Sequence, residues 1–273
     1  MSSEVVPTVY GAVGRCIYCG AQGSREDQLS KEHIVPYGLA GNWMILPQAS
    51  CGRCRTITGE VERFCQREMF GSVRIRMKLP TRHPENRHST LPLELIRTDG
   101  RHERIAVPSE DALVMILGFR FPAPGLLRGV PSAENFDGEL LAKPLVEVGQ
   151  GETWRKHLAP EGQRVRVGTI GMLTFARMLA KIAHSYAVAL LGLDSFRPYL
   201  RDLILGRSTT GPYLVSGDPR PLEMQTNTLH RVYREDCIRG GVNYVLVAIQ
   251  LFAFMGMPRY HVVVGERHGW IRV

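Results

Sequence analysis

Residues 16–54 read CIYCGAQGSREDQLSKEHIVPYGLAGNWMILPQASCGRC and contain two Cys-x-x-Cys pairs, Cys16/Cys19 and Cys51/Cys54. A gap of two residues lets one turn of the chain supply two thiolates, and two such turns can close a tetrahedral site around one Zn²⁺. The alternatives are a buried thiol pair or a thioredoxin-like redox pair, but the redox motif belongs to an apolar βαβ context that this stretch lacks. The pattern therefore predicts a structural zinc site, which has no open position for chemistry.

The segment between the two pairs places a carboxylate, Glu32, directly beside an imidazole, His33. Leu29–Pro36 has the alternation of a short strand that ends at its proline. Trp43–Leu46 is a second short apolar run, and Ile57–Met69 has apolar residues at helical spacings. The predicted order is cysteine pair, strand, loop, strand, cysteine pair and helix.

This order resembles the HNH endonucleases that have the ββα-metal fold and a four-cysteine zinc. The resemblance rests on Ser30–Pro36, Leu46–Cys54 and Ile57-Thr58, and it covers about residues 15–75. It implies a zinc-stabilised HNH nuclease region that hydrolyses phosphodiester bonds in DNA. It also implies a role in restriction or phage defence.

The resemblance further implies roles for the residues between the cysteine pairs. His33 would be the general base that takes a proton from the attacking water, because an imidazole titrates near neutral pH. Glu32 would hold a divalent cation, with Mg²⁺ as the main candidate, and this cation would stabilise the leaving 3′ oxygen. Neighbours on a strand point to opposite faces, so the two side chains can serve one phosphate only if the strand ends or twists there. The alternatives for His33 are a polar residue at a strand end or a neighbour of the zinc site with no catalytic role.

One position departs from the family pattern. Zinc-bearing HNH enzymes commonly have Asn or His directly after the last cysteine as the second metal ligand, whereas this chain has Arg55, which cannot ligate a cation. Arg55, Thr58 and Glu62 lie at i, i+3 and i+7 and share a helix face. Glu62 is therefore a candidate ligand for the catalytic cation or an ordinary solvated acid, and Arg55 is a candidate for holding the scissile phosphate. The family's central Asn has no clear match either, because Asn42 lies closer to His33 than the pattern expects.

The charge balance suits a polyanionic partner, with 34 Lys and Arg against 26 Asp and Glu and a net charge of +8. Val73–Lys78 alternates between apolar and basic residues, which predicts a strand with Arg74, Arg76 and Lys78 on one face. Together with Arg53, these cations are candidates for contacts to phosphates that read no sequence. A solvated basic face is the alternative.

The rest of the chain predicts a mixed α+β region. Thr81–Thr90 is polar, so we place a boundary there between a zinc-binding nuclease domain, 1–80, and a second domain, 90–273. Several elements are predicted in the second domain: strands at Leu91–Ile96 and Arg104–Val107, helices at Thr174–Leu191 and Phe196–Leu205, and a hairpin of Val242–Phe252 with Tyr260–Val264. This domain is a candidate for partner recognition, ligand binding or homodimer formation.

The N-terminus lacks the basic and apolar pattern of a secretory signal, and the apolar stretches are interrupted or short. We therefore expect a cytoplasmic protein with no membrane partner, in which thiols favour metal over disulfides. The preferred function is a metal-dependent HNH endonuclease. The alternatives are a catalytically impaired nucleic-acid-binding module and a zinc-stabilised interaction protein that contacts no nucleic acid.

Overall fold

The computed structural model describes residues 6–25, 27–96, 99–132, 137–145, 164–166, 169–218 and 227–268. Its helices are α1 (Tyr37–Ala40), α2 (Gly52–Phe64), α3 (Gly71–Arg76), α4 (Gly125–Arg128), α5 (Met172–Leu191), α6 (Arg201–Ile204) and α7 (Gly211–Leu214), with a π-helical turn η1 (Cys65–Met69) and 3-10 turns η2 (Pro84–Asn86) and η4 (Ala253–Met255). Its strands are β1 (Thr8–Val9), β2 (Ser30–His33), β3 (Met44–Ser50), β4 (Thr90–Ile96), β5 (His102–Pro108), β6 (Met115–Arg120), β7 (Glu139–Pro144), β8 (Arg164–Arg166), β9 (Phe196–Pro198), β10 (Val215–Gly217), β11 (His230–Arg239), β12 (Val242–Leu251) and β13 (Arg259–Arg267). The expected α+β class is confirmed.

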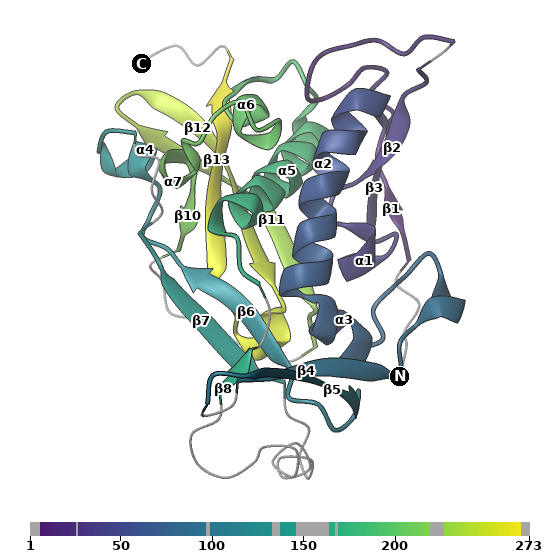
Figure 1. Cartoon of the computed structure of the whole chain (residues 1–273). Coiled ribbons are helices and arrows are strands. Elements are labelled where there is room, and N and C mark those ends of the chain that lie inside the picture. The colour runs from purple at the N-terminus through teal and green to yellow at the C-terminus, as the bar shows by residue number, and fades with distance from the viewer. Residues whose placement is uncertain are drawn as a thin grey trace.

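The strands form separate sheets around the two long helices (Figure 1). One small sheet has the order β1-β3-β2, and α2 follows β3 directly. The largest sheet has the order β10-β13-β12-β11, with β9 also pairing with β13. Helix α5 packs against α2 on one side and against β12 and β13 on the other, so it joins the cysteine-rich region to this sheet.

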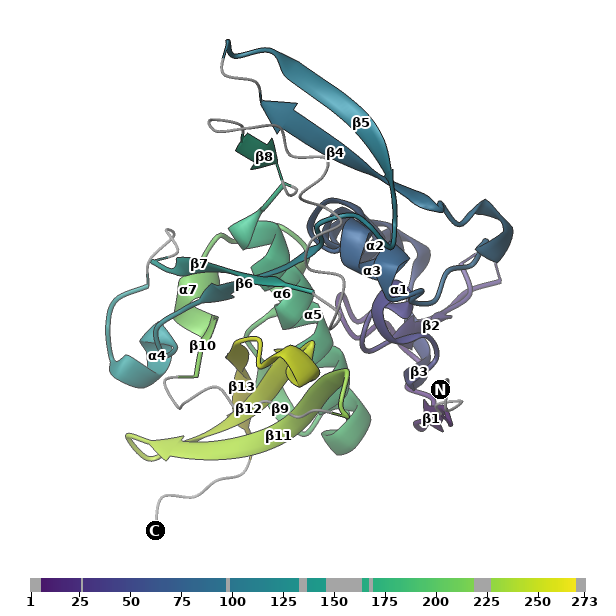
Figure 2. The same ribbon diagram turned by 90° about the horizontal axis from the view of Figure 1, so that it is seen from below.

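The remaining strands lie at one end of the molecule. β4 pairs with β5 and β8, while β6 pairs with β7. Seen from below, the β4–β5 hairpin projects away from the helices (Figure 2). The predicted strands in this part and the predicted antiparallel pairing of the last two long strands are confirmed.

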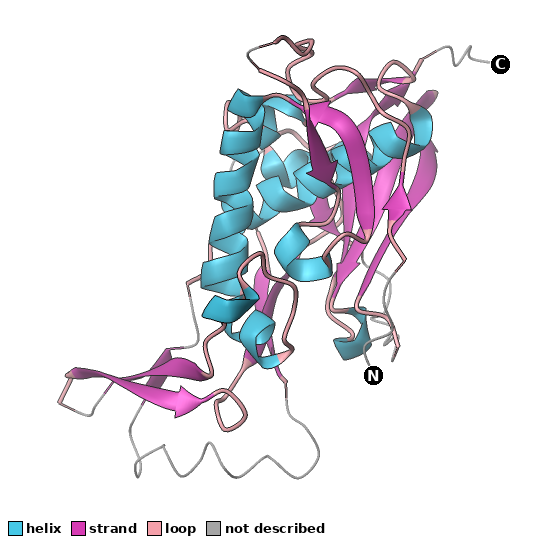
Figure 3. Cartoon of the chain, turned by 90° about the vertical axis from the view of Figure 1, so that its right-hand side faces the viewer, coloured by secondary structure: helices cyan, strands magenta, loops and turns pink. Residues whose placement is uncertain are grey.

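The predicted strand at Val73–Lys78 is wrong, because this segment forms α3 and continues the helical path of α2 and η1 (Figure 3). Residues two apart on a helix point about 200° from each other, so the cations do not share a face. Arg74 bonds to carbonyl oxygens of three nearby segments, and the Arg76 Nη1 donates to the Ser109 carbonyl at 2.7 Å. Lys78 lies beyond the helix in a left-handed conformation, with φ of 53°.

The predicted helix at Phe196–Leu205 is wrong in its first half. Phe196–Pro198 pairs with β13 as strand β9, and only Arg201–Ile204 is helical. Proline disfavours the helical conformation of the residue before it, here Arg197, so a helix does not begin at Phe196. Phe196 is buried in the strand, whereas Arg197 is exposed.

Buried contacts join the cysteine-rich region to the rest of the chain. One hydrophobic cluster contains residues from both sides of the predicted boundary at 81–90, which itself stays a prediction. The buried His184 of α5 donates from Nε2 to the Ile17 carbonyl at 2.8 Å. The buried His230 of β11 donates to the Leu39 carbonyl at 3.2 Å and accepts from the Phe252 amide at 3.1 Å.

Across the described part of the chain, no helix combines the length and the apolar character needed to cross a membrane.

Acid should weaken this fold through His184 and His230, because burial lowers the pKa of each imidazole to about 4. The unfolded chain binds these protons near pH 6.5, so the unfolded state holds more protons between pH 6.5 and 4. The free energy of unfolding is therefore unaffected by protonation of these histidines above pH 6.5. It should fall by on the order of 3 kcal/mol per histidine as pH approaches 4. Urea unfolding at pH 7 and pH 4.5 measures the loss.

In that experiment His230→Gln should flatten the dependence of stability on pH, whereas His102→Gln, on the exposed part of β5, should leave it unchanged. A wild-type protein with equal stability at both pH values would contradict the prediction.

Candidate functional site

The two Cys-x-x-Cys pairs converge on one point. The Sγ atoms of Cys16, Cys19, Cys51 and Cys54 all lie within 4.8 Å of one another, and the pair Cys19–Cys51 is separated by 3.7 Å. Four thiolates about 2.3 Å from a tetrahedral Zn²⁺ have sulfurs about 3.8 Å apart. The residues therefore fit the predicted structural zinc.

The environment of these thiols also favours a cation. Burial raises the pKa of Cys54, and the neighbouring sulfur of Cys16 raises it further. Four thiolates this close repel one another unless a cation neutralises them. Asp27 supports the second pair, because its carboxylate accepts the Gly52 amide at 2.9 Å where α2 begins.

Zinc removal should destabilise the protein. Cys54→Ser should abolish stoichiometric zinc and cost on the order of 5 kcal/mol of unfolding free energy, since metal binding contributes directly to folding. Elemental analysis and urea unfolding measure both effects. Cys237→Ser, on β11 and outside the cluster, is the matched control and should retain one zinc per chain. A zinc-free wild-type protein with the same stability would contradict the assignment.

Glu32 and His33 stand at the end of β2, on the floor of an open groove of about 630 Å³. The strand ends at His33, so both side chains line the groove although they are neighbours in sequence. Arg55, Thr58 and Glu62 line it from α2, which confirms the predicted shared helix face. The basic residues that line the groove are Lys31, Arg55, Arg63, Arg67, Arg74 and Arg82.

His33 is held in a defined orientation. Its Nε2 lies 3.1 Å from the Asn42 Oδ1, and its ring lies 5.5 Å from that of Tyr37 in an edge-to-face arrangement. An amide oxygen only accepts hydrogen bonds, so Nε2 carries the proton and Nδ1 is the basic nitrogen of the neutral ring. Burial lowers the pKa of His33, and the charges of Lys181 and Lys31 lower it further against the hydrogen bond to Asn42. The imidazole is therefore neutral at neutral pH.

The carboxylates of Glu32 and Glu62 share a partner that the sequence analysis missed. The Nζ of Lys181, from the middle of α5, lies 2.5 Å from Glu32 Oε1 and 2.7 Å from Glu62 Oε1. It also donates to the His33 carbonyl. An ammonium has three donors, and all three are used. The Lys181 side chain is only 1% exposed, so it reaches the site from inside the protein.

The charges in this group shift the pKa values of Lys181 and Glu32. Burial lowers the pKa of Lys181, but Glu32 and Glu62 together shift it above its ordinary value, so the lysine is protonated. Burial raises the pKa of Glu32, and Lys181 only partly opposes this shift. We call Glu32, Glu62 and Lys181 the buried ion cluster.

The residues do not fit the divalent cation expected at Glu32 and Glu62. The nearer oxygens of both carboxylates are bonded to Lys181, which lies between them. Within the described ranges, the four cysteines make up the one group of three or more candidate ligand residues close enough to share an ion. A divalent cation at this place would have to expel a buried ammonium and leave it unpaired.

Breaking the buried ion cluster should be costly. Lys181→Met leaves two carboxylates close together without their counter-ion and should cost about 3–5 kcal/mol in urea unfolding. The double variant Lys181→Met/Glu32→Gln should recover part of that loss. Lys143→Met is the control, because the Lys143 ammonium bonds to the neutral carbonyls of Met255 and Gly256. Equal losses in Lys181→Met and Lys143→Met would refute the charge argument.

Most of the predicted phosphate contacts lie elsewhere. Arg53 is exposed on the first turn of α2 but does not line the groove, and neither do Arg76 and Lys78. Arg74 lines it, with its guanidinium bonded to the carbonyls of Gly38, Gln66 and Pro80. The basic side chains that line the groove come from β2, α2, η1, α3 and the segment after α3.

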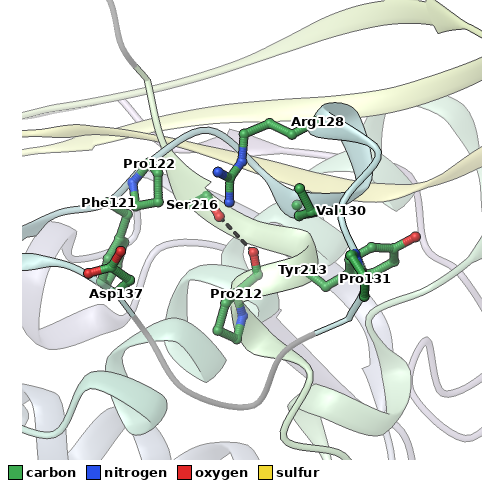
Figure 4. Close-up of a pocket in the computed structure, with 10 residues that line it drawn as sticks. Phe121, Pro122, Arg128, Val130, Pro131, Asp137, Pro212, Tyr213 and Ser216 are labelled. Atoms are coloured by element: carbon green, nitrogen blue, oxygen red, sulfur yellow. Dashed lines mark hydrogen bonds between the residues drawn. The ribbon is translucent and has the colours of Figure 1, made fainter.

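A second cavity lies beside α4 and α7 (Figure 4) and shares no lining residue with this groove. Its volume is about 100 Å³, well below the roughly 300–1,000 Å³ of ordinary ligand sites. Arg128 and Asp137 lie on different sides of it, and the Ser216 hydroxyl donates to the Pro212 carbonyl at 3.0 Å. Its size excludes a substrate of nucleotide dimensions.

The sequence did not predict Lys181, which interrupts an apolar helix, although a lysine on such a face is itself a sign of a buried counter-ion. It also did not predict the pairing of Asn42 with His33, because this pairing depends on the fold of α1 between them. Cys65, on η1 and outside the thiol cluster, is fully buried.

Comparison of the chain with protein-family models, with curated proteins and with solved structures finds no match in any of the three. The geometry of the groove therefore carries the functional argument.

Proposed function

We propose that the groove binds the backbone of a nucleic acid, with DNA as the first substrate to test, and that His33 promotes hydrolysis of a phosphodiester there. The observation that carries the proposal is a neutral imidazole at the floor of a groove lined by six Lys and Arg side chains. Such a groove attracts a polyanion through its backbone charge.

In this reaction, the Nδ1 of His33 takes a proton from a water molecule that attacks the phosphorus. The bond from phosphorus to the leaving sugar oxygen breaks, and that oxygen takes a proton from solvent. Arg55, exposed at the groove, offers a planar fork of donors to the phosphate oxygens and stabilises their charge.

The buried ion cluster makes the approach of a phosphate feasible. Two unpaired carboxylates at the floor would repel an anion, whereas Lys181 neutralises one of their two charges. The ammonium of Lys181 is buried, so it does not touch the substrate. It acts only through its electric field and by holding Glu32 and His33 in position.

The sequence also suggested Mg²⁺ at Glu32 and Glu62, where it would stabilise the leaving oxygen. Because Lys181 fills that place, the proposed reaction uses no such ion. Lys181 also favours a second candidate function, a groove that binds nucleic acid without cutting it.

A plasmid cleavage assay tests the proposal, with Mg²⁺ in one arm and EDTA in the other. His33→Ala should lower the cleavage rate by about 10²–10⁴-fold. The matched control is His83→Ala, because His83 lines the groove on its exposed rim. Since the pKa of His33 is lowered, wild-type cleavage should persist below pH 6.5 and decline only at more acidic pH.

Equal cleavage rates for wild type and His33→Ala would contradict the catalytic role of His33. Salt-sensitive DNA binding with no cleavage in either arm would support the second candidate instead. Cleavage that needs Mg²⁺ and is lost in Glu62→Gln would show that a cation does displace Lys181.

A further inference from the structure

A further hollow, distinct from the small cavity at α4, continues the groove past the end of α2. Its volume is about 370 Å³, and it shares Gln66, Arg67, Arg74 and Thr81 with the groove, so the two are contiguous. Arg87 adds a guanidinium and His88 an imidazole to its lining, which contains no Asp or Glu. We call Arg67, Arg74 and Arg87 with this hollow the arginine pocket.

Arg74 is fixed at the centre of this pocket. Its Nε donates to the Gly38 carbonyl at 2.7 Å, its Nη1 to the Gln66 carbonyl at 3.2 Å and its Nη2 to the Pro80 carbonyl at 3.3 Å. A side chain on Gly38 would collide with Gln66 and Arg74, so the glycine permits this close approach. All three partners are neutral carbonyl groups, so these bonds hold the positive charge of Arg74 in place without balancing it.

The other two arginines add to that charge. The Nη2 of Arg87 donates to the Leu79 carbonyl at 3.0 Å, again a neutral partner. Arg67 is exposed on η1 and faces the same hollow. Burial lowers the pKa of Arg74, and the charges of Arg67 and Arg87 lower it further.

Such an arrangement is unfavourable in the free protein. Like charges at close range repel, and a half-buried guanidinium is less well screened by water than an exposed one. A bound anion would remove the repulsion and could accept hydrogen bonds from several guanidinium groups at once. The hollow is also large enough for one nucleotide-sized group.

We propose that the arginine pocket binds a phosphate group, and that this phosphate belongs to the same polynucleotide strand whose phosphodiester lies at His33. The second half of this statement rests on the proposed function. The contiguous groove gives the strand a path, with one phosphate at the arginine pocket and another at the floor. The pocket would then fix the position of the strand and contact no base edge.

The test measures binding, and it uses the full chain with His33→Ala so that cleavage does not interfere. Fluorescence anisotropy follows labelled single-stranded oligonucleotides that carry either a 5′-phosphate or a 5′-hydroxyl, over a range of salt concentrations. Inorganic phosphate and pyrophosphate serve as competitors. The variants are Arg67→Ala and Arg67→Glu, because this exposed side chain can change without disturbing the core.

Arg67→Ala should weaken oligonucleotide binding by about tenfold and reduce the salt slope by about 0.7, the value for one contact to a single strand. Arg67→Glu should weaken it further. The control is Arg128→Ala, which removes the same charge from an exposed site beside the separate cavity at α4 and should change affinity less than twofold.

The two oligonucleotides distinguish the source of the phosphate. A preference for the 5′-phosphate that disappears in Arg67→Glu identifies a strand end, whereas equal loss for both oligonucleotides identifies an internal phosphodiester. The proposal would be overturned if the Arg67 variants bound every oligonucleotide and both competitors with the same affinity as the control Arg128→Ala. Competition by inorganic phosphate that depends on Arg67, without oligonucleotide binding, would keep the phosphate site and refute the nucleic-acid function.

Discussion

The ammonium of Lys181 is bonded at once to β2 and to α2 from the middle of α5. Its three donors meet two carboxylates and the His33 carbonyl, so one buried cation sets the separation of the elements that form the floor of the groove. A buried lysine is tolerated only with such compensation, because burial alone would remove its proton. The shape of the site therefore depends on α5, a helix more than one hundred residues away from β2 in the sequence.

This dependence explains why the cysteine-rich region is bonded so closely to the rest of the chain. His184 lies one turn after Lys181 on α5 and reaches the Ile17 carbonyl beside the first cysteine pair. His230, from β11, holds the Leu39 carbonyl of α1 between the two strands. The thiol cluster and the His184 contact lie at one end of β2, β3 and α2, and the His230 contact to α1 lies at the other.

Local order was readable from the sequence, and long-range pairing was not. The cysteine spacing predicted the thiol cluster, and the helical spacing after Cys54 placed Arg55 and Glu62 on the face that lines the groove. The short basic segment at Val73–Lys78 misled, because strict alternation over six residues favours a strand locally, whereas the segment continues the preceding helical path. Lys181 could not be assigned, since its partners are identified only by tertiary packing.

The thiol cluster and the buried ion cluster share a limit that directs the chemistry elsewhere. A Zn²⁺ surrounded by four thiolates has no open position, and an ammonium surrounded by three oxygens has no free donor. Both cations would therefore stabilise structure, and the proposed function leaves the substrate to groups on the groove surface. Those groups are the imidazole of His33, whose basic nitrogen is left free by Asn42, and the guanidinium groups around it. Their fixed position is what the two buried clusters supply.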